Sequence, residues 1–125
     1  MIEAPAAIAA GMVGLTAYGA AYPRAQLFGP IICRTGAPNK LAITFDDGPN
    51  PAITPKLLDL LAKRNARATF FLVGKFVREC PDLTREILAR GHSLGNHTDT
   101  HPNLFLCGRQ KTEEELKRCA DAICR

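Results

Sequence analysis

The chain has 125 residues, of which 46% are hydrophobic and 22% charged, and this composition is typical of one small globular domain. It excludes collagen-like, mucin-like and wholly disordered chains. Sixteen Lys and Arg against twelve Asp and Glu give a net charge of +4, and residues 1–33 hold only Glu3 and Arg24. Because the basic excess is mild and interspersed along residues 34–125, we expect no nucleic-acid partner.

The first 39 residues differ from the rest of the chain. Residues 4–23 carry no charge and have about the length that crosses a hydrocarbon core, but they are rich in alanine and glycine. Two interpretations stay open: a membrane helix over 4–23, which implies contact with a membrane or the cell envelope, and a soluble helix or disordered extension, which fits a cytoplasmic protein. A signal peptide is less favoured, because the residues before the apolar stretch include the acidic Glu3 and no basic residue.

Residues 24–39 are rich in Pro and Gly and are expected to be a linker. If residues 4–23 insert into a membrane, the basic residues after them favour a cytoplasmic position for the following domain. These residues are Arg24, Arg34 and Lys40.

Residues 40–125 are expected to form the globular domain, with strands alternating with helices. The strands are expected at 41–45, 68–73 and 92–95, and the helices at 54–64, 81–90 and 112–123. This order predicts a parallel α/β sheet with right-handed crossovers, and three strands leave its edges open.

Each expected helix has a start signal and an apolar stripe. Thr54 is expected to cap the first helix before Pro55, Pro81 to begin the second, and the sequence from Thr112 to Glu115 has the form of a capping box. The side chains expected to face the core are Leu57, Leu58, Leu60, Leu61, Leu83, Ile87, Leu88, Leu116, Cys119, Ala120 and Ile123.

Candidate functional residues follow the first and third strands, whose carboxyl ends meet at one edge of a parallel sheet. Adjacent residues on a strand point to opposite faces, so Asp46 and Asp47 can serve one site only if the chain leaves strand geometry, which Gly48 permits. A solvated acidic turn is the alternative interpretation.

His97 and His101 are four residues apart, which puts both rings on one face of a helical turn and suits a divalent ion. Ordinary surface or core histidines are the alternative. Two His plus one Asp is nevertheless a common hydrolytic zinc set with open coordination positions. The remaining histidine, His92, is expected to be structural.

Four segments resemble the first half of the polysaccharide deacetylase domain (NodB homology, carbohydrate esterase family 4). They are TFDDG (44–48), TPKLLDLL (54–61), ATFFLVG (68–74) and GHSLGNHTDTH (91–101). The resemblance implies a partial (β/α) barrel of that type over residues 40–125, and a hydrolase that removes N-acetyl groups from N-acetylglucosamine units of a chitin- or peptidoglycan-like glycan.

The resemblance also implies roles for individual residues. Asp46 takes the place of the catalytic base, Asp47, His97 and His101 the places of the metal ligands, and Thr98 the Ser/Thr place that stabilises the loop. Zinc is the first choice of metal for such a set, with Co²⁺, Mn²⁺ or iron as alternatives.

The family's later motifs have no counterpart here. These are an Arg-x-Pro-aromatic segment, an Asp-x-x-Asp-Trp segment and a late Leu-x-His that supplies the general acid, whereas this chain has no Trp, no Pro after Pro102 and no His after His101. We therefore expect an N-terminal fragment of such an enzyme. Two further hypotheses stay open: a non-catalytic remnant that binds metal or glycan, and a structural role.

Two other features give weaker expectations. The five cysteines are odd in number and form no CxxC pair, so free thiols are expected; they are Cys33, Cys80, Cys107, Cys119 and Cys124. The apolar residues 104–106 are expected to pack their loop onto the core, with a substrate groove as the alternative.

Overall fold

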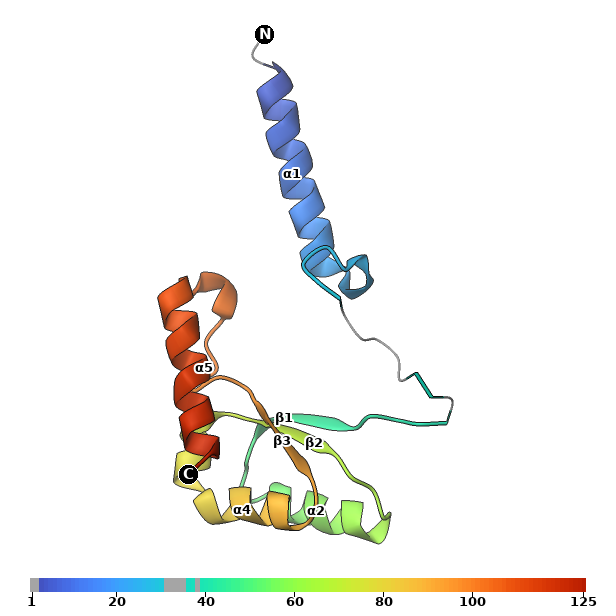
Figure 1. Ribbon diagram of the computed structural model, residues 1–125, viewed down its shortest axis with the longest axis vertical. Coiled ribbons are helices and arrows are strands. Elements are labelled where there is room, and N and C mark those ends of the chain that lie inside the picture. Colours follow the sequence, from blue (N-terminus) through green and yellow to red (C-terminus); the bar gives the residue numbers. More distant parts are fainter. Residues whose placement is uncertain (1–2, 31–35, 38) are drawn as a thin grey trace. The chain divides into compact units, whose positions relative to one another are not determined.

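The computed structural model describes residues 3–30, 36–37 and 39–125. The chain forms two compact units, one ending at Leu41 and the other spanning Ala42–Arg125 (Figure 1). Each unit is described by itself below. Cys33 and Arg34 lie outside the described residues.

The first unit consists of helix α1 (Glu3–Ala21) and the 3₁₀ turn η1 (Pro23–Ala25). The rings of Tyr18 and Tyr22 stack with centroids 5.6 Å apart. No helix among the described residues combines the length and apolar character needed to cross a membrane. Helix α1 overlaps most of the predicted 4–23 segment. The interpretation of this segment as a membrane span is not supported, since alanine and glycine add little apolar surface.

The second unit is built on a parallel sheet, which confirms the predicted fold class. Its strands are β1 (Thr44–Gly48), β2 (Thr69–Leu72) and β3 (Ser93–Asn96), in the order β1-β2-β3. Strand β1 begins three residues later than expected, because its paired register with β2 starts at Thr44 opposite Thr69, and it includes the aspartates predicted to follow it. Among the described residues, no strand flanks the outer edge of β1 or β3.

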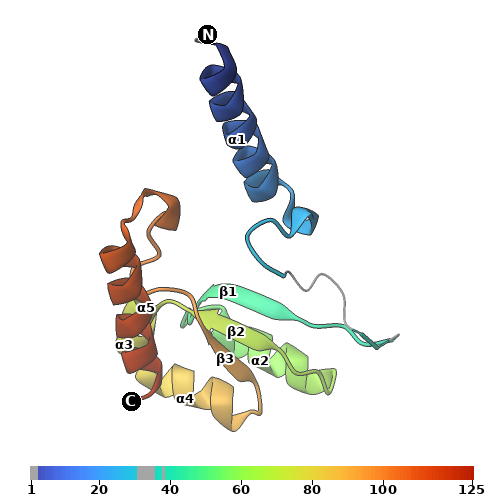
Figure 2. The same ribbon diagram turned by 45° about the horizontal axis from the view of Figure 1, so that its top comes forward.

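Helices α2 (Thr54–Lys63) and α4 (Pro81–Ala89) lie on the same face of the sheet (Figures 1 and 2). The core between them and the sheet consists of Leu58, Leu61, Ala68, Phe70, Leu72, Val77 and Ile87. The predictions for Leu60, Leu88, Leu116 and Ala120 are wrong, since all four side chains are exposed. Each lies one or two residues after a buried residue, too close along the helix to share the narrow face that reaches the core.

Two shorter elements and one long helix complete the unit. Helix α3 (Gly74–Glu79) was not predicted, because six residues are too few to show helical periodicity. Helix α5 (Arg109–Ile123) begins three residues before Thr112, whose hydroxyl donates to the Gly108 carbonyl oxygen inside the first turn. The predicted capping box is therefore wrong.

The apolar turn η2 (Leu104–Leu106) does not pack onto the core as predicted. Phe105 and Leu106 are 89% and 85% exposed. The Asn103 side chain accepts a hydrogen bond from the Phe105 backbone N–H at 3.1 Å, so a local polar contact shapes this turn.

Gly74 sits where α3 approaches α5 and the loop after β3. A Cβ added to Gly74 would lie 2.5 Å from Asp99 Oδ1 and 2.9 Å from the Cys119 Cα. Because backbone atoms cannot yield cheaply, we expect Gly74→Ala to reduce the free energy of unfolding by about 3 kcal/mol in urea denaturation. Gly108→Ala, which has open space around the added carbon, is expected to cost about 1 kcal/mol or less, and equal losses would contradict the crowding.

Candidate metal centre

The first part of the site comes from an irregularity in β1. Asp47 has φ of +65°, and the register of β1 on β2 shifts between Phe45 and Gly48. The chain therefore leaves regular strand geometry as predicted, but at Asp47 rather than at Gly48. Asp47 is exposed, and Asp46, which precedes it on β1, is exposed as well.

The second part of the site is the segment 97–101, which follows β3. The His97 N–H donates to the Leu72 carbonyl oxygen at 3.0 Å, and the chain then turns with φ of +66° at Thr98 and +57° at His101. This segment is not helical, so the prediction of a helical turn is wrong. Positive φ at a β-branched residue such as Thr98 is rare and must be held by surrounding contacts.

The two parts meet at Asp47, His97 and His101. Asp47 Oδ1 lies 3.3 Å from His97 Nε2 and 3.4 Å from His101 Nε2, and the two imidazole centroids are 4.8 Å apart. Their potential ligand atoms all lie within 4.8 Å of one another. Tetrahedral zinc with bonds of about 2.0–2.1 Å separates its ligand atoms by about 3.3 Å, so the donor types and spacing fit a divalent ion.

Thr98 is buried and forms hydrogen bonds to the end of β3, to the start of α3 and to His101 of its own loop. Its hydroxyl accepts the His101 N–H at 3.0 Å, its own N–H donates to Asn96 Oδ1 at 2.9 Å, and its carbonyl oxygen accepts the Gly74 N–H at 3.0 Å. The Asn96 amide also donates to the Leu116 carbonyl oxygen of α5 at 2.7 Å. These bonds hold the backbone between the two histidines.

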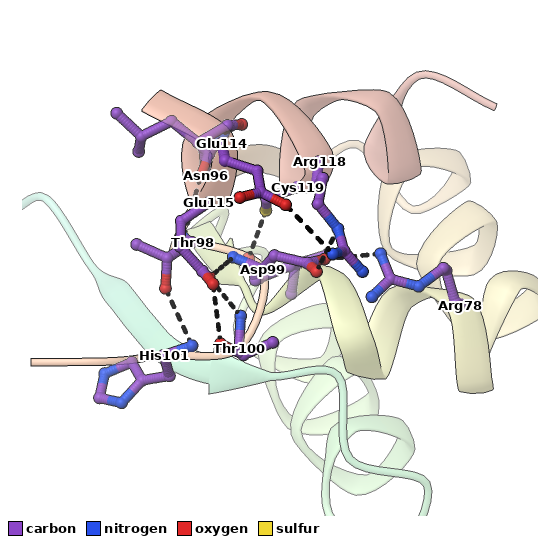
Figure 3. A network of polar contacts seen from close by, with 12 residues as sticks. Arg78, Asn96, Thr98, Asp99, Thr100, His101, Glu114, Glu115, Arg118 and Cys119 are labelled. Atoms are coloured by element: carbon purple, nitrogen blue, oxygen red, sulfur yellow. Dashed lines mark hydrogen bonds and ion pairs between the residues drawn. The ribbon is translucent and has the colours of Figure 1, made fainter. Parts of the chain in front are cut away.

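Glu115 of α5 binds the same loop from the protein interior, and its side chain is 1% exposed. One carboxylate oxygen accepts the N–H groups of Asp99 and Thr100 at 3.0 and 2.7 Å (Figure 3). The other accepts the Thr100 hydroxyl at 3.0 Å and lies 2.9 Å from Lys111 Nζ. Burial acts to raise the pKa of Glu115, but the bonds from Lys111 and Thr100 outweigh it and lower this pKa to about 2.

Asp99 is fully buried and pairs with two arginines (Figure 3). Its Oδ1 accepts from Arg78 of α3 at 2.6 Å. Its Oδ2 lies 3.0 Å from Arg118 Nε of α5 but outside the direction of a hydrogen bond. The bond to Asp99 raises the pKa of Arg78. The loop is thus bound to both α3 and α5.

Sequence reasoning missed Glu115 and the two arginines. One signal was available: Glu115 lies one helical turn before Cys119, so a charged residue occupied the apolar stripe of α5. Because Glu115 was interpreted as part of a capping box, its place in the apolar stripe was not recognised. The arginines had none, because exposed arginines on helices are ordinary.

His92 and the four described cysteines lie outside the cluster. His92 is buried, its Nδ1 accepts the Ala68 N–H at 3.2 Å, and burial lowers its pKa. The expected free thiols are confirmed for Cys80, Cys107, Cys119 and Cys124. Cys119 is buried and donates to the Leu72 carbonyl oxygen at 3.2 Å, and burial raises the pKa of this thiol.

The lowered pKa of Glu115 predicts a specific loss of stability in acid. Its ionised form stabilises the folded state above the unfolded-state pKa near 4.5, and this contribution is lost as the pH falls toward 2. We expect a loss of about 3 kcal/mol from this group, measured by urea unfolding with a chelator present. Glu115→Gln should be less stable than the wild type at neutral pH and lack this component, whereas Glu113→Gln on the exposed face of α5 should keep it. An unchanged acid dependence in Glu115→Gln would contradict the assignment.

Comparison with known proteins identifies the family. Residues 34–125 match the profile of the polysaccharide deacetylases. A chitooligosaccharide deacetylase of Sinorhizobium fredii is 47% identical over 89 residues, which cover 71% of this chain and 41% of that protein. The chain thus spans about two fifths of that relative's length.

Two solved structures are similar to this fold. The peptidoglycan deacetylase PdaC of Bacillus subtilis has a TM-score of 0.64 at 39% identity, over 66% of this chain and 41% of that one. A mutant of a family 4 pseudoenzyme with restored enzymatic activity has a TM-score of 0.65 at 31% identity, over 70% of this chain and 33% of that one. The profile match and these likenesses show that the chain belongs to the polysaccharide deacetylase family and has part of the α/β fold of its members.

Proposed function

We propose that Asp46, Asp47, His97 and His101 form the metal-binding and proton-accepting side of an active site. This site removes N-acetyl groups from N-acetylglucosamine-containing glycans. The observation that carries the proposal is the convergence of Asp47, His97 and His101 at one edge of the sheet in a member of the deacetylase family. The relatives named for chitooligosaccharide and peptidoglycan support this class of substrate.

Asp47, His97 and His101 would hold the ion, and zinc suits two imidazoles and one carboxylate best, with Co²⁺ or Mn²⁺ as alternatives. When bound, the ion would supply Lewis-acid chemistry toward the acyl carbonyl and the attacking water. The three ligands leave coordination positions for both.

Asp46 is proposed as the general base. It neighbours the ligand Asp47 on β1 and is exposed, so a water molecule can reach its carboxylate. As water adds to the acyl carbon, a carboxylate oxygen of Asp46 accepts the proton. Breaking the carbon–nitrogen bond then releases acetate, and the departing amine requires a proton from a general acid.

A second candidate is binding of metal or glycan without turnover. One observation favours it: a similar solved structure is a mutant, with restored enzymatic activity, of a family 4 pseudoenzyme, so a member of this family can lack turnover. Acetate release separates the two functions, because only the first consumes substrate.

The proposed roles predict different effects for two substitutions. Asp46→Asn should keep zinc affinity and abolish acetate release from N-acetylglucosamine oligomers, because only the proton acceptor is lost. His101→Ala should weaken zinc binding by about 100-fold or more, since losing a ligand costs at least as much as losing its supporting contacts. Zinc affinity is measured by calorimetric titration and acetate by an enzymatic assay.

Each other outcome has a defined meaning. Full activity in Asp46→Asn would show that another group is the base. Zinc binding by the unsubstituted chain without acetate release would favour the second candidate. A chain that binds neither these metals (zinc, Co²⁺ or Mn²⁺) nor an N-acetylglucosamine oligomer would contradict both and leave a structural role.

A further inference from the structure

We propose that Glu115 is a positioning residue of the metal centre, which sets the geometry of the segment carrying His97 and His101 without contacting the ion. The inference rests on the proposed function, because it assigns a purpose to a contact that supports the proposed ligands. It concerns helix α5, which contributes no ligand to the cluster of Asp47, His97 and His101.

Glu115 binds the backbone in the middle of the segment between the two histidines. Its carboxylate accepts the consecutive N–H groups of Asp99 and Thr100, and these two residues lie between Thr98 and His101. Only a few backbone bonds therefore separate the groups that Glu115 binds from the Cα atoms of His97 and His101. A change in this anchor moves the Cα atoms from which the ligand side chains extend.

The conformation of the segment explains why such an anchor is needed. Thr98 and His101 both have positive φ, which costs about 1–3 kcal/mol for a non-glycine residue held in a sparsely populated region. Without the carboxylate, the N–H groups of Asp99 and Thr100 would be left without their acceptor next to a buried side chain. The segment would then relax toward ordinary φ values and carry His101 away from Asp47.

The charge on Glu115 is also matched to this task. Ionised oxygens form shorter and stronger hydrogen bonds to backbone N–H groups than neutral ones do. Both oxygens are occupied, one by two backbone donors and the other by the Thr100 hydroxyl and Lys111. A glutamine of the same size has one acceptor oxygen, so it cannot reproduce this arrangement.

The test is the zinc affinity of Glu115→Gln in the full chain at neutral pH. Loss of supporting contacts around a metal typically weakens its binding by 10- to 100-fold, and we expect a loss of at least about 10-fold. Glu113→Gln removes the same charge from the exposed face of α5, where it pairs with Arg109, and should bind zinc like the unsubstituted chain. With Co²⁺ in place of zinc, the visible absorption spectrum should change in Glu115→Gln and stay constant in Glu113→Gln.

A general loss of stability must be separated from a specific effect on the site. Ile87→Val creates a small core defect on α4, away from the loop, and should leave zinc affinity within about twofold of the unsubstituted chain after correction for unfolded protein. If Glu115→Gln also stays within about twofold and keeps its Co²⁺ spectrum, the inference is overturned while the proposed function stands. If the unsubstituted chain binds no metal, the proposed function and the inference both fail.

A milder pair of variants covers the case in which Glu115→Gln does not fold. Thr100→Val removes the hydroxyl that donates to Glu115, and Thr84→Val removes a comparable hydroxyl bond, from Thr84 of α4 to the Cys80 carbonyl oxygen. We expect Thr100→Val to weaken zinc binding several-fold and Thr84→Val to leave it unchanged. Equal affinities in the two variants would overturn the inference.

Discussion

A buried carboxylate bound to two consecutive backbone N–H groups is the interaction on which the candidate site depends. Glu115 is 1% exposed and accepts the N–H groups of Asp99 and Thr100, in the middle of the segment that carries His97 and His101. A backbone with positive φ at Thr98 and His101 is unfavourable in isolation. The tertiary contact with α5 therefore selects a conformation that the local sequence does not favour.

Burying two acids behind one loop is stable only because each charge is compensated. An ionised carboxylate taken from water without partners would cost several kcal/mol, and its pKa would rise. Glu115 instead receives bonds from Thr100 and Lys111, and its pKa falls to about 2. Asp99 lies between Arg78 of α3 and Arg118 of α5. The same pairs that offset desolvation therefore join two helices to the loop, so electrostatic compensation and positioning are a single feature of this fold.

The sequence predicted what depends on short-range pattern and on topology. Short apolar runs indicated three parallel strands, and apolar stripes indicated the helices near 54–64 and 81–90. Because the carboxyl ends of parallel strands meet at one edge of a sheet, the sequence also predicted that Asp47 lies near His97 and His101. The details that failed depend on contacts between distant residues. The His97–His101 spacing suggested a helical turn, whereas Thr98 and His101 adopt positive φ because of bonds to Asn96, Gly74 and Glu115. Periodicity could not distinguish a capping Glu115 from a buried one, since both fit a helix.

The two halves of the cluster are consequently supported in different ways. Asp47 is exposed and is presented by an irregularity within β1 itself, next to Asp46. The histidines lie on a segment fixed by α3, α5 and the end of β3 through bonds that include Gly74, Asn96 and Glu115. A perturbation in α5 therefore moves the imidazoles relative to a carboxylate that stays in place. Because metal affinity depends on the distance between these groups rather than on either alone, a helix without a ligand can still control the site.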